Sequence, residues 1–237
     1  MKKLLSLFLL AGMLVSFTAC TDETLNPLPG WDYSVHGYNI FDGIAFNGVK
    51  TARPQPYERD YSKNFSVTGQ DASKVPFKIR WVSLDNKLTV NKIEIYVRML
   101  EYYNDPEGNP KTADLSGNGK GKLYTTLTSA ANRQWTSYTI DANKVLELYK
   151  NATVKYNKVT AVPVFSNPSR PRPAGAYFRV GETAKYGDVA ADDFVVTWKL
   201  YTADGKVFDT FNPDSICGDP TPVSEANSNC QSVFGVK

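Results

Sequence analysis

The chain contains a single histidine, His36, in the segment "DYSVHGYN". Catalysis by a Ser-His-Asp or Cys-His system needs a histidine that takes the proton of the nucleophile. The G-x-S-x-G sequence that presents a nucleophilic serine is absent, and the glycines of "SGNGKGK" lack the spacing of a phosphate-binding loop. We therefore interpret His36 as incidental and predict no catalytic residue of this kind.

Adjacent acids are a second candidate for chemistry. Two carboxylates hydrolyse a glycosidic bond when both face the same sugar, and Asp192 and Asp193 are neighbours in the sequence. The residues around them alternate as in a strand, where adjacent side chains point to opposite faces. The sequence thus disfavours a glycoside hydrolase, and we expect the protein not to be an enzyme.

The segment "NDPEGNP" spaces oxygen ligands as calcium loops do. Asp105, Glu107 and Asn109 occupy alternate positions there. The glycine and the distant glutamate of an EF-hand are not at their positions. A solvated polar turn fits the segment better, with calcium as a structural ion the alternative. We predict no metal site and no other cofactor.

Two tyrosines, Tyr102 and Tyr103, stand at the start of a glycine-rich polar stretch, 101–122, which we expect to be a long irregular connection. An exposed tyrosine offers a flat ring on which sugars stack with little loss of entropy. The alternative is that both rings cap the core at a strand end. We take this pair as the candidate ligand-binding residues.

The elements that position these residues are predicted to be strands, because period-two alternation dominates the chain. "FKIRWVSL" and "KIEIYVRML" alternate in this way, and "DFVVTWKLYTADGKVF" is typical of a hairpin with its turn at "ADG". A short apolar stripe near 141–151, with Asp141 as N-cap, predicts one helix. We expect a mostly β fold of one or two antiparallel β-sandwich (Ig-like) units, with the helix closing one end.

The composition is typical of a globular body, with 42% hydrophobic and 22% charged residues. We expect residues 31–155 to form a β-sandwich domain. Residues 156–237 form a C-terminal hairpin region that completes the same sandwich or makes a second one, and the sequence leaves this choice open.

The first residues have the layout of a secretory signal peptide, predicted to span residues 1–19. "MKK" is followed by the apolar run "LLSLFLLAGMLVSF" and by small residues at Thr18 and Ala19. The run is shorter than the roughly 20 residues of a spanning helix. Removal of Lys2 and Lys3 lowers the formal charge from +3 to +1, which gives no field for nucleic acid.

The residues "FTAC" that end this segment resemble the lipobox of bacterial lipoproteins. The resemblance implies that Cys20 is acylated and becomes the mature N-terminus, and two or three acyl chains hold a protein durably on a membrane. The alternative is an ordinary secretory signal with a coincidental cysteine. Residues 20–30 then form a flexible tether, and Asp22 and Glu23 resemble the signal that sends lipoproteins of the Bacteroidota to the cell surface.

With Cys20 acylated, two cysteines remain, Cys217 and Cys230. In an oxidising compartment such a pair favours a disulfide, worth about 3 kcal/mol in the chain-entropy model. Free thiols or a metal site are the alternatives, and a metal site needs more ligands than one histidine supplies. The tripeptide "DSI" resembles the O-glycosylation sequon of the Bacteroidota, with Ser215 as acceptor; chance explains it as well.

The body resembles the small lipoproteins encoded beside SusC/SusD-like nutrient-uptake systems in Bacteroidota. The residues that carry this are "KIEIYVRML", "WTSYTIDANKVLELYKN" and "YGDVAADDFVVTWKLYTADGKVF". The resemblance implies β-sandwich domains, a lipid anchor in the outer membrane, transporter subunits as partners, and a glycan or peptide ligand. It brings no catalytic residues. The expected function is a non-enzymatic accessory or ligand-binding subunit, with a purely structural accessory lipoprotein as the alternative.

Overall fold

The computed structural model describes residues 34–43, 63–83, 86–172, 176–179, 192–209 and 231–237. All of them belong to one compact unit, Ser34–Lys237. The expected signal peptide and tether lie outside the described residues, and so do four side chains with assigned roles: Cys20, Ser215, Cys217 and Cys230. Lipidation, glycosylation and the disulfide therefore stay predictions.

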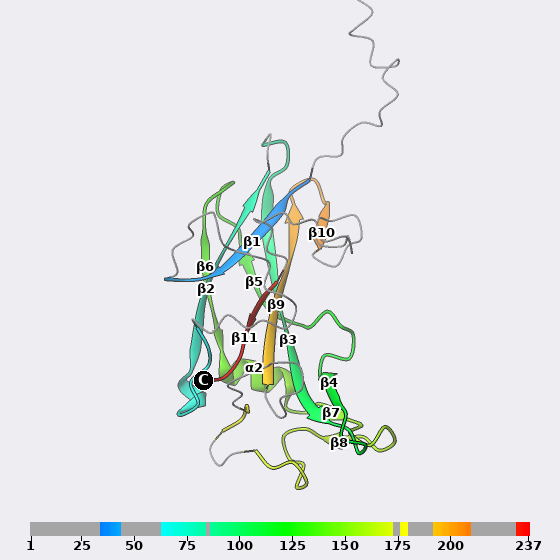
Figure 1. The fold of residues 1–237 in the computed structure, drawn as a ribbon. Helices are drawn as coiled ribbons and strands as arrows, with labels where there is room; N and C mark the ends of the chain where they lie inside the picture. Colours follow the sequence, from blue (N-terminus) through cyan, green and yellow to red (C-terminus); the bar gives the residue numbers. More distant parts are fainter. Residues whose placement is uncertain (1–33, 44–62, 84–85, 173–175, 180–191, 210–230) are drawn as a thin grey trace, which may run out of the picture. The chain divides into compact units, whose positions relative to one another are not determined.

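Two antiparallel sheets dominate the described residues (Figure 1). The three-stranded sheet has the order β1-β2-β6, and its strands are β1 (His36–Phe41), β2 (Lys74–Val82) and β6 (Thr136–Asp141). The six-stranded sheet has the order β10-β9-β3-β4, with β5 beside β3 and β11 beside β9. Its strands are β3 (Val90–Asn104), β4 (Pro110–Asp114), β5 (Lys122–Thr128), β9 (Asp192–Thr202), β10 (Val207–Asp209) and β11 (Ser232–Phe234). A separate two-stranded pair consists of β7 (Thr153–Val154) and β8 (Val162–Pro163).

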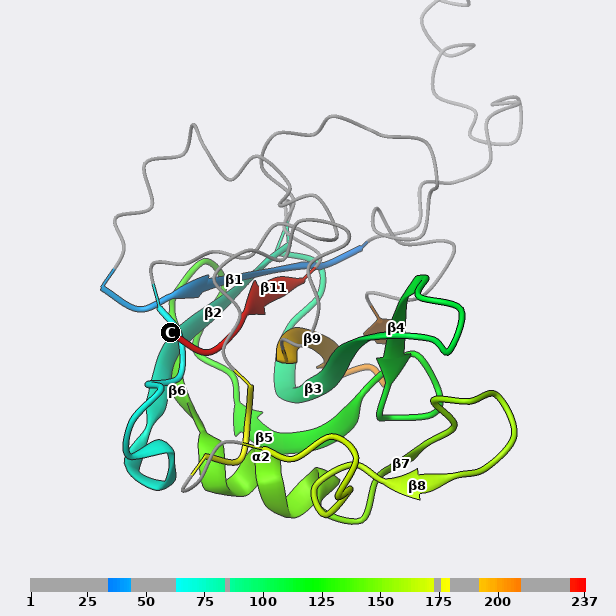
Figure 2. The same cartoon turned by 60° about the horizontal axis from the view of Figure 1, so that its bottom comes forward.

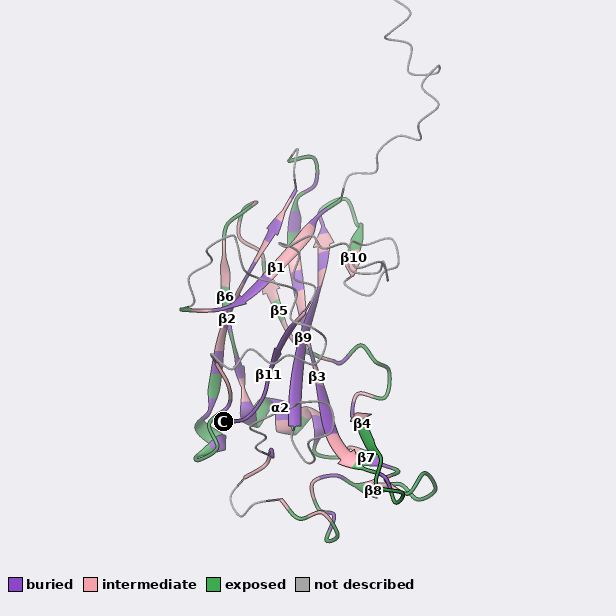
Figure 3. Ribbon diagram, in the orientation of Figure 1, coloured by how far each residue is buried: buried purple, intermediate pink, exposed green. Residues whose placement is uncertain are grey.

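The expectation of a mostly β, antiparallel fold with one short α-helix is confirmed for the described residues. Alternation explains the strands, since every second residue is buried along β2 and, in β3, from Ile93 to Met99 (Figure 3). Buried phenylalanines join the two sheets: the ring centroids of Phe77 on β2 and Phe234 on β11 lie 5.7 Å apart. This packing is sandwich-like, and the Ig-like topology stays a prediction.

The long strand β3 is the centre of the larger sheet. One of its edges pairs with β9 along almost its whole length, from Val90 to Glu101. The other edge is shared, because β5 pairs with Lys92–Val97 and β4 with Leu100–Asn104. The C-terminal hairpin β9–β10 is therefore part of the same sheet as β3.

The predicted helix is α2 (Ala142–Tyr149), and it begins where the sequence placed its N-cap. The Asp141 carboxylate accepts hydrogen bonds from the backbone N–H groups of Asn143 and Lys144, which satisfies two donors that a helix start leaves open. Tyr149, fully buried, donates its hydroxyl to the carbonyl of Val97 at 2.6 Å. The helix thus lies against β5 and β3 at one end of the sheets (Figure 2).

The expectation of an irregular connection over 101–122 is wrong for its first part. β3 continues to Asn104 and then returns through a hairpin as β4, with Tyr103 opposite Lys111. Asp105 forms the turn, because its carboxylate accepts the backbone N–H of Asn109 at 2.8 Å. The polar and glycine-rich composition hid a strand pairing that needs only backbone groups.

Candidate functional site

The core faces of β3 and β9 end in two carboxylates. Along β3 the inward positions are apolar up to Met99 and then change to Glu101; along β9 the inward Phe194 is preceded by Asp192. Glu101 and Asp192 are directly opposite each other in the strand register, and both are fully buried. Like charges placed opposite each other repel, and buried charges need partners. This end of the sheet therefore requires cations.

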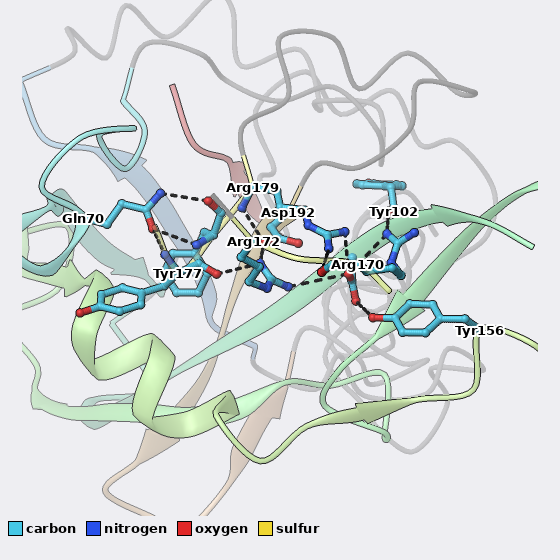
Figure 4. Close-up of polar contacts among 10 residues, drawn as sticks. Gln70, Tyr102, Tyr156, Arg170, Arg172, Tyr177, Arg179 and Asp192 are labelled. Carbon is cyan, nitrogen blue, oxygen red and sulfur yellow. Dashed lines mark hydrogen bonds and ion pairs between the residues drawn. The ribbon is translucent and has the colours of Figure 1, made fainter. Parts of the chain in front are cut away.

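Three arginines supply those cations. Arg179 lies with Nη1 3.1 Å from Oε1 of Glu101, and Arg170 and Arg172 lie 3.5 and 3.7 Å from the same oxygen. Arg172 also pairs with Oδ2 of Asp192. We call Glu101, Arg170, Arg172, Arg179 and Asp192 the arginine cluster (Figure 4).

Backbone contacts position the arginines, because the segment that carries them has little regular structure. The fully buried amide of Gln70 accepts the N–H groups of Tyr177 and Phe178 and donates to the carbonyl of Phe178 at 3.0 Å. The N–H of Arg179 donates to Oδ2 of Asp192 at 2.8 Å. The segment is thus fixed at residues 177–179, directly beside the cluster.

Burial and the neighbouring charges of the cluster shift the pKa of Arg179 in opposite directions. Burial lowers the pKa of its guanidinium, and the charges of Arg172 and Arg170 lower it further, while Glu101 and Asp192 raise it. The net direction is downward, so desolvation and mutual repulsion of the arginines outweigh the attraction of the two acids.

An aromatic rim borders the cluster where β3 ends. The guanidinium of Arg170 lies 4.7 Å from the ring centroid of Tyr156 and 5.8 Å from that of Tyr103. The two rings meet edge to face at 5.0 Å. Nη2 of Arg170 also donates to the carbonyl of Tyr102 at 3.3 Å. We call Tyr103, Tyr156 and Arg170 the aromatic rim.

The two tyrosines of the predicted ligand-binding pair have different surroundings. Tyr103 lies on the same strand face as Glu101 and packs against the core and Tyr156, whereas Tyr102, one residue earlier, faces the other side. Both are half-buried. The structure therefore brings Tyr103 into the rim, and Tyr102 contributes its backbone carbonyl.

The other residues considered for chemistry lie apart from the rim. His36 is in β1, and burial lowers the pKa of its imidazole. Asp193 is buried beside Asp192 but on the opposite strand face, as strand alternation predicts. The acids that share a face are instead Asp192 and Glu101, and arginines bind both of them.

Two of the acids considered as calcium ligands, Asp105 and Glu107, pair with lysines of the chain itself. Oδ2 of the buried Asp105 lies 3.6 Å from Nζ of Lys158 and 3.8 Å from Nζ of Lys111. Glu107 pairs with Lys158 at 2.9 Å. Within the described ranges, no group of three or more His, Cys, Asp and Glu side chains is placed to hold a metal ion.

Sequence reasoning missed Glu101 and the three arginines, although the sequence contained a signal. Glu101 continues the inward series Ile93, Ile95, Val97 and Met99, so an acid falls on a buried face. A buried acid predicts a cationic partner, and "SRPRPAGAYFR" is the segment richest in arginine. Its proline content concealed this, because an extended segment has no periodicity to place its side chains.

A second polar group lies on the outer face of the large sheet. Oε2 of Glu94 accepts the hydroxyls of Tyr96 and Tyr201, and Lys92 donates to Oε1 at 3.0 Å. Burial opposes ionisation of Glu94, but these hydrogen bonds outweigh it and lower its pKa. The hydrogen bond to Glu94 in turn raises the pKa of Tyr201 to about 12. The polar groups of Glu94, Lys92 and the two tyrosines thus supply one another's hydrogen-bond partners.

Every helix that the structure describes is too short or too polar to cross a membrane. No family model matches this chain, and no curated protein matches it in sequence.

Proposed function

We propose that the protein is a surface-exposed, outer-membrane lipoprotein that binds a glycan or peptide as a non-enzymatic accessory subunit of a SusC/SusD-like uptake complex. The location is supported by "FTAC" and by the acids Asp22 and Glu23. The anchor and tether would hold the β-sheet body close to the transporter, which raises the effective concentration of whatever the body binds.

The aromatic rim is the observation that supports ligand binding. Tyr103 and Tyr156 offer rings, and Arg170 offers a cation, at the margin of the arginine cluster where its side chain is 20% exposed. Rings combined with a planar donor are the groups that recognise sugars and polar peptide segments. The cluster beneath fixes Arg170 in place, so little entropy is lost on binding.

The alternative is a purely structural accessory subunit. It is favoured by the carbonyl of Arg170, which accepts Nη2 of Arg179 at 2.6 Å, and by the bond from Gln70 to Phe178. The first contact links two residues of the arginine-bearing segment and the second ties that segment to Gln70, and both stabilise the fold without any ligand.

Native affinity gels containing neutral or acidic polysaccharides, together with peptide titrations, test ligand binding on the mature protein in detergent. The variant Tyr103→Ala removes a rim ring, and Tyr201→Ala removes a half-buried tyrosine on the outer sheet face. We expect at least one of these ligands to bind the wild type and Tyr201→Ala but not Tyr103→Ala. Thermal melts confirm that both variants are folded. If no polysaccharide or peptide binds the wild type, the ligand-binding role is wrong.

Localisation and partner need a separate experiment. We expect Cys20→Ala to leave the membrane fraction, and proteases added to intact cells to remove the wild-type protein. Co-purification of transporter subunits from solubilised membranes supports the accessory role. Survival of the protein under conditions that remove a known surface protein contradicts the surface location.

A further inference from the structure

The arginine cluster has more cations than anions. Arg170, Arg172 and Arg179 carry three positive charges, while Glu101 and Asp192 carry two negative charges. Four of these five side chains are at most 7% exposed, so water screens the excess poorly. The lowered pKa of Arg179, with burial as the largest cause and Arg172 next, agrees with an uncompensated positive charge.

The hydrogen-bond donors of the cluster are also in excess. Among the residues that the structure describes, three buried donor atoms of the cluster have no hydrogen-bond acceptor, namely Nε of Arg170 and Nε and Nη2 of Arg172, whereas Oδ1 of Asp192 is the one unpartnered acceptor of the cluster. Arg172 is 5% exposed and its Nη2 reaches Glu101 only at 3.7 Å. Buried donors without acceptors are costly. An additional acceptor with negative charge would correct both imbalances.

Solvent reaches the cluster at Arg170. Its side chain is 20% exposed, against 5% for Arg172 and 7% for Arg179. The contacts of its guanidinium to Glu101 and to the Tyr102 carbonyl use Nη2, and its Nε is buried, so Nη1 is the nitrogen that remains for a ligand. The rings of Tyr103 and Tyr156 flank this position.

We infer that the ligand is an acidic saccharide, of the uronic-acid class, whose carboxylate pairs with Arg170 while its ring lies along the aromatic rim. This inference rests on the proposed function and narrows it to one ligand class. A carboxylate forms a charge-assisted hydrogen bond with a guanidinium nitrogen such as Nη1 of Arg170, and a pyranose face matches an aromatic side chain. The excess charge of Arg172 attracts the acid from beneath.

The test compares each of four uronic-acid polysaccharides with its methyl ester: polygalacturonate, alginate, hyaluronan and chondroitin. Esterification keeps the rings and removes the charge. Binding is measured on the mature protein in affinity gels and by calorimetry, with Arg170→Gln as the variant. The matched control is Arg133→Gln, the same change at an exposed arginine in the turn before β6. Arg170→Gln leaves two arginines and two acids, a balanced cluster, and should therefore fold.

We expect at least one acid to bind, its ester to bind roughly tenfold more weakly or worse, and Arg170→Gln to lose the acid to the same extent. Arg133→Gln should bind as the wild type, and binding should weaken as salt is raised. Equal binding of acid and ester overturns the ligand class but keeps the proposed function. Binding of neutral glycans or peptides, without binding of any acidic saccharide, also overturns the ligand class but keeps the proposed function.

Two further outcomes also contradict the inference. If acetate or sulfate competes as well as the saccharide, the cluster is an anion site without sugar recognition. If the acid binds Arg170→Gln as tightly as the wild type, the site lies elsewhere on the protein. Failure of every polysaccharide and peptide overturns the proposed function itself, and the cluster is then a purely structural network.

Discussion

Tyr156 donates its hydroxyl to Oε2 of Glu101 at 2.6 Å, although 55 positions separate the two residues. Tyr156 lies between β7 and β8, and Glu101 lies near the end of β3. The bond therefore ties a hairpin outside the two large sheets to the buried end of the long strand. Burial raises the pKa of Tyr156, and the bond and charge of Glu101 raise it further, so the phenol stays protonated as the donor.

Replacing Tyr156 by Phe removes this donor and keeps the ring. We expect the free energy of unfolding to fall by about 1.5 kcal/mol, because the hydrogen bond is made to a charged acceptor. Urea denaturation at neutral pH measures the change. Tyr103→Phe is the control, since the described contacts of Tyr103 involve its ring. An equal loss in both variants would show that the hydroxyl of Tyr156 contributes nothing specific.

Within the described residues, replacing Glu101 by Gln leaves the three arginines of the cluster with Asp192 as their one acid. We expect a loss of about 3 kcal/mol or more, because breaking a buried ion pair strands charge that water cannot reach. Glu147→Gln provides the comparison: its pair with Lys150 is exposed on α2 and should leave the stability unchanged. Thermal and urea unfolding of both variants measure the difference. A stability for Glu101→Gln equal to that of the wild type would contradict the account of the cluster.

Gly121, just before β5, has a φ of +88°, and an added Cβ would lie 2.8 Å from the carbonyl oxygen of Val97 on β3. Gly119 has a φ of +71° and open space around it. Both Gly→Ala changes incur the left-handed backbone penalty of about 1 kcal/mol. We expect Gly121→Ala to lose more than that, because backbone must move. If urea denaturation shows equal losses of unfolding free energy for the two variants, the backbone at Gly121 makes room for the added Cβ without strain.

His36 gives a pH dependence with a definite sign. Burial lowers its pKa below 6.5, so the unfolded chain takes up a proton before the folded protein does. The stability from neutral His36 is complete above pH 6.5 and is lost as the pH falls towards the folded-state pKa. NMR of the single imidazole should give a pKa below 6.5.

His36→Gln is the variant that isolates this contribution. We expect the difference in unfolding free energy between wild type and variant to be constant above about pH 7.5 and to shift against the wild type below pH 6.5. A constant difference down to pH 5 would show that the imidazole is as hydrated as in the unfolded chain.

Local sequence patterns predicted those strands and the helix whose formation depends on residues close together in the chain. Alternation located β2, β3 and the β9–β10 hairpin, because one face of each meets the core. Asp141 marked the start of α2 through its own hydrogen bonds. β4 was missed, because its pairing with the end of β3 uses backbone groups and leaves no apolar alternation.

The candidate site was only partly predictable for the same reason. Tyr103 was singled out as an aromatic residue at the margin of a polar stretch, and it does lie in the rim. Glu101, Asp192 and the arginines come together only when β3, β9 and the segment near Arg170 are assembled. No local rule joins residues so distant in the chain.

The sequence by itself determined the strand periodicity, the helix start and the expectation of a lipid-anchored protein, because each depends on residues that are close together in the chain. Tertiary structure alone decided that two acids face each other across β3 and β9, that three arginines surround them, and that Tyr103 and not Tyr102 joins Tyr156. Strand register decides which charges oppose one another, and a buried acid must take its cation from whichever segment can reach it.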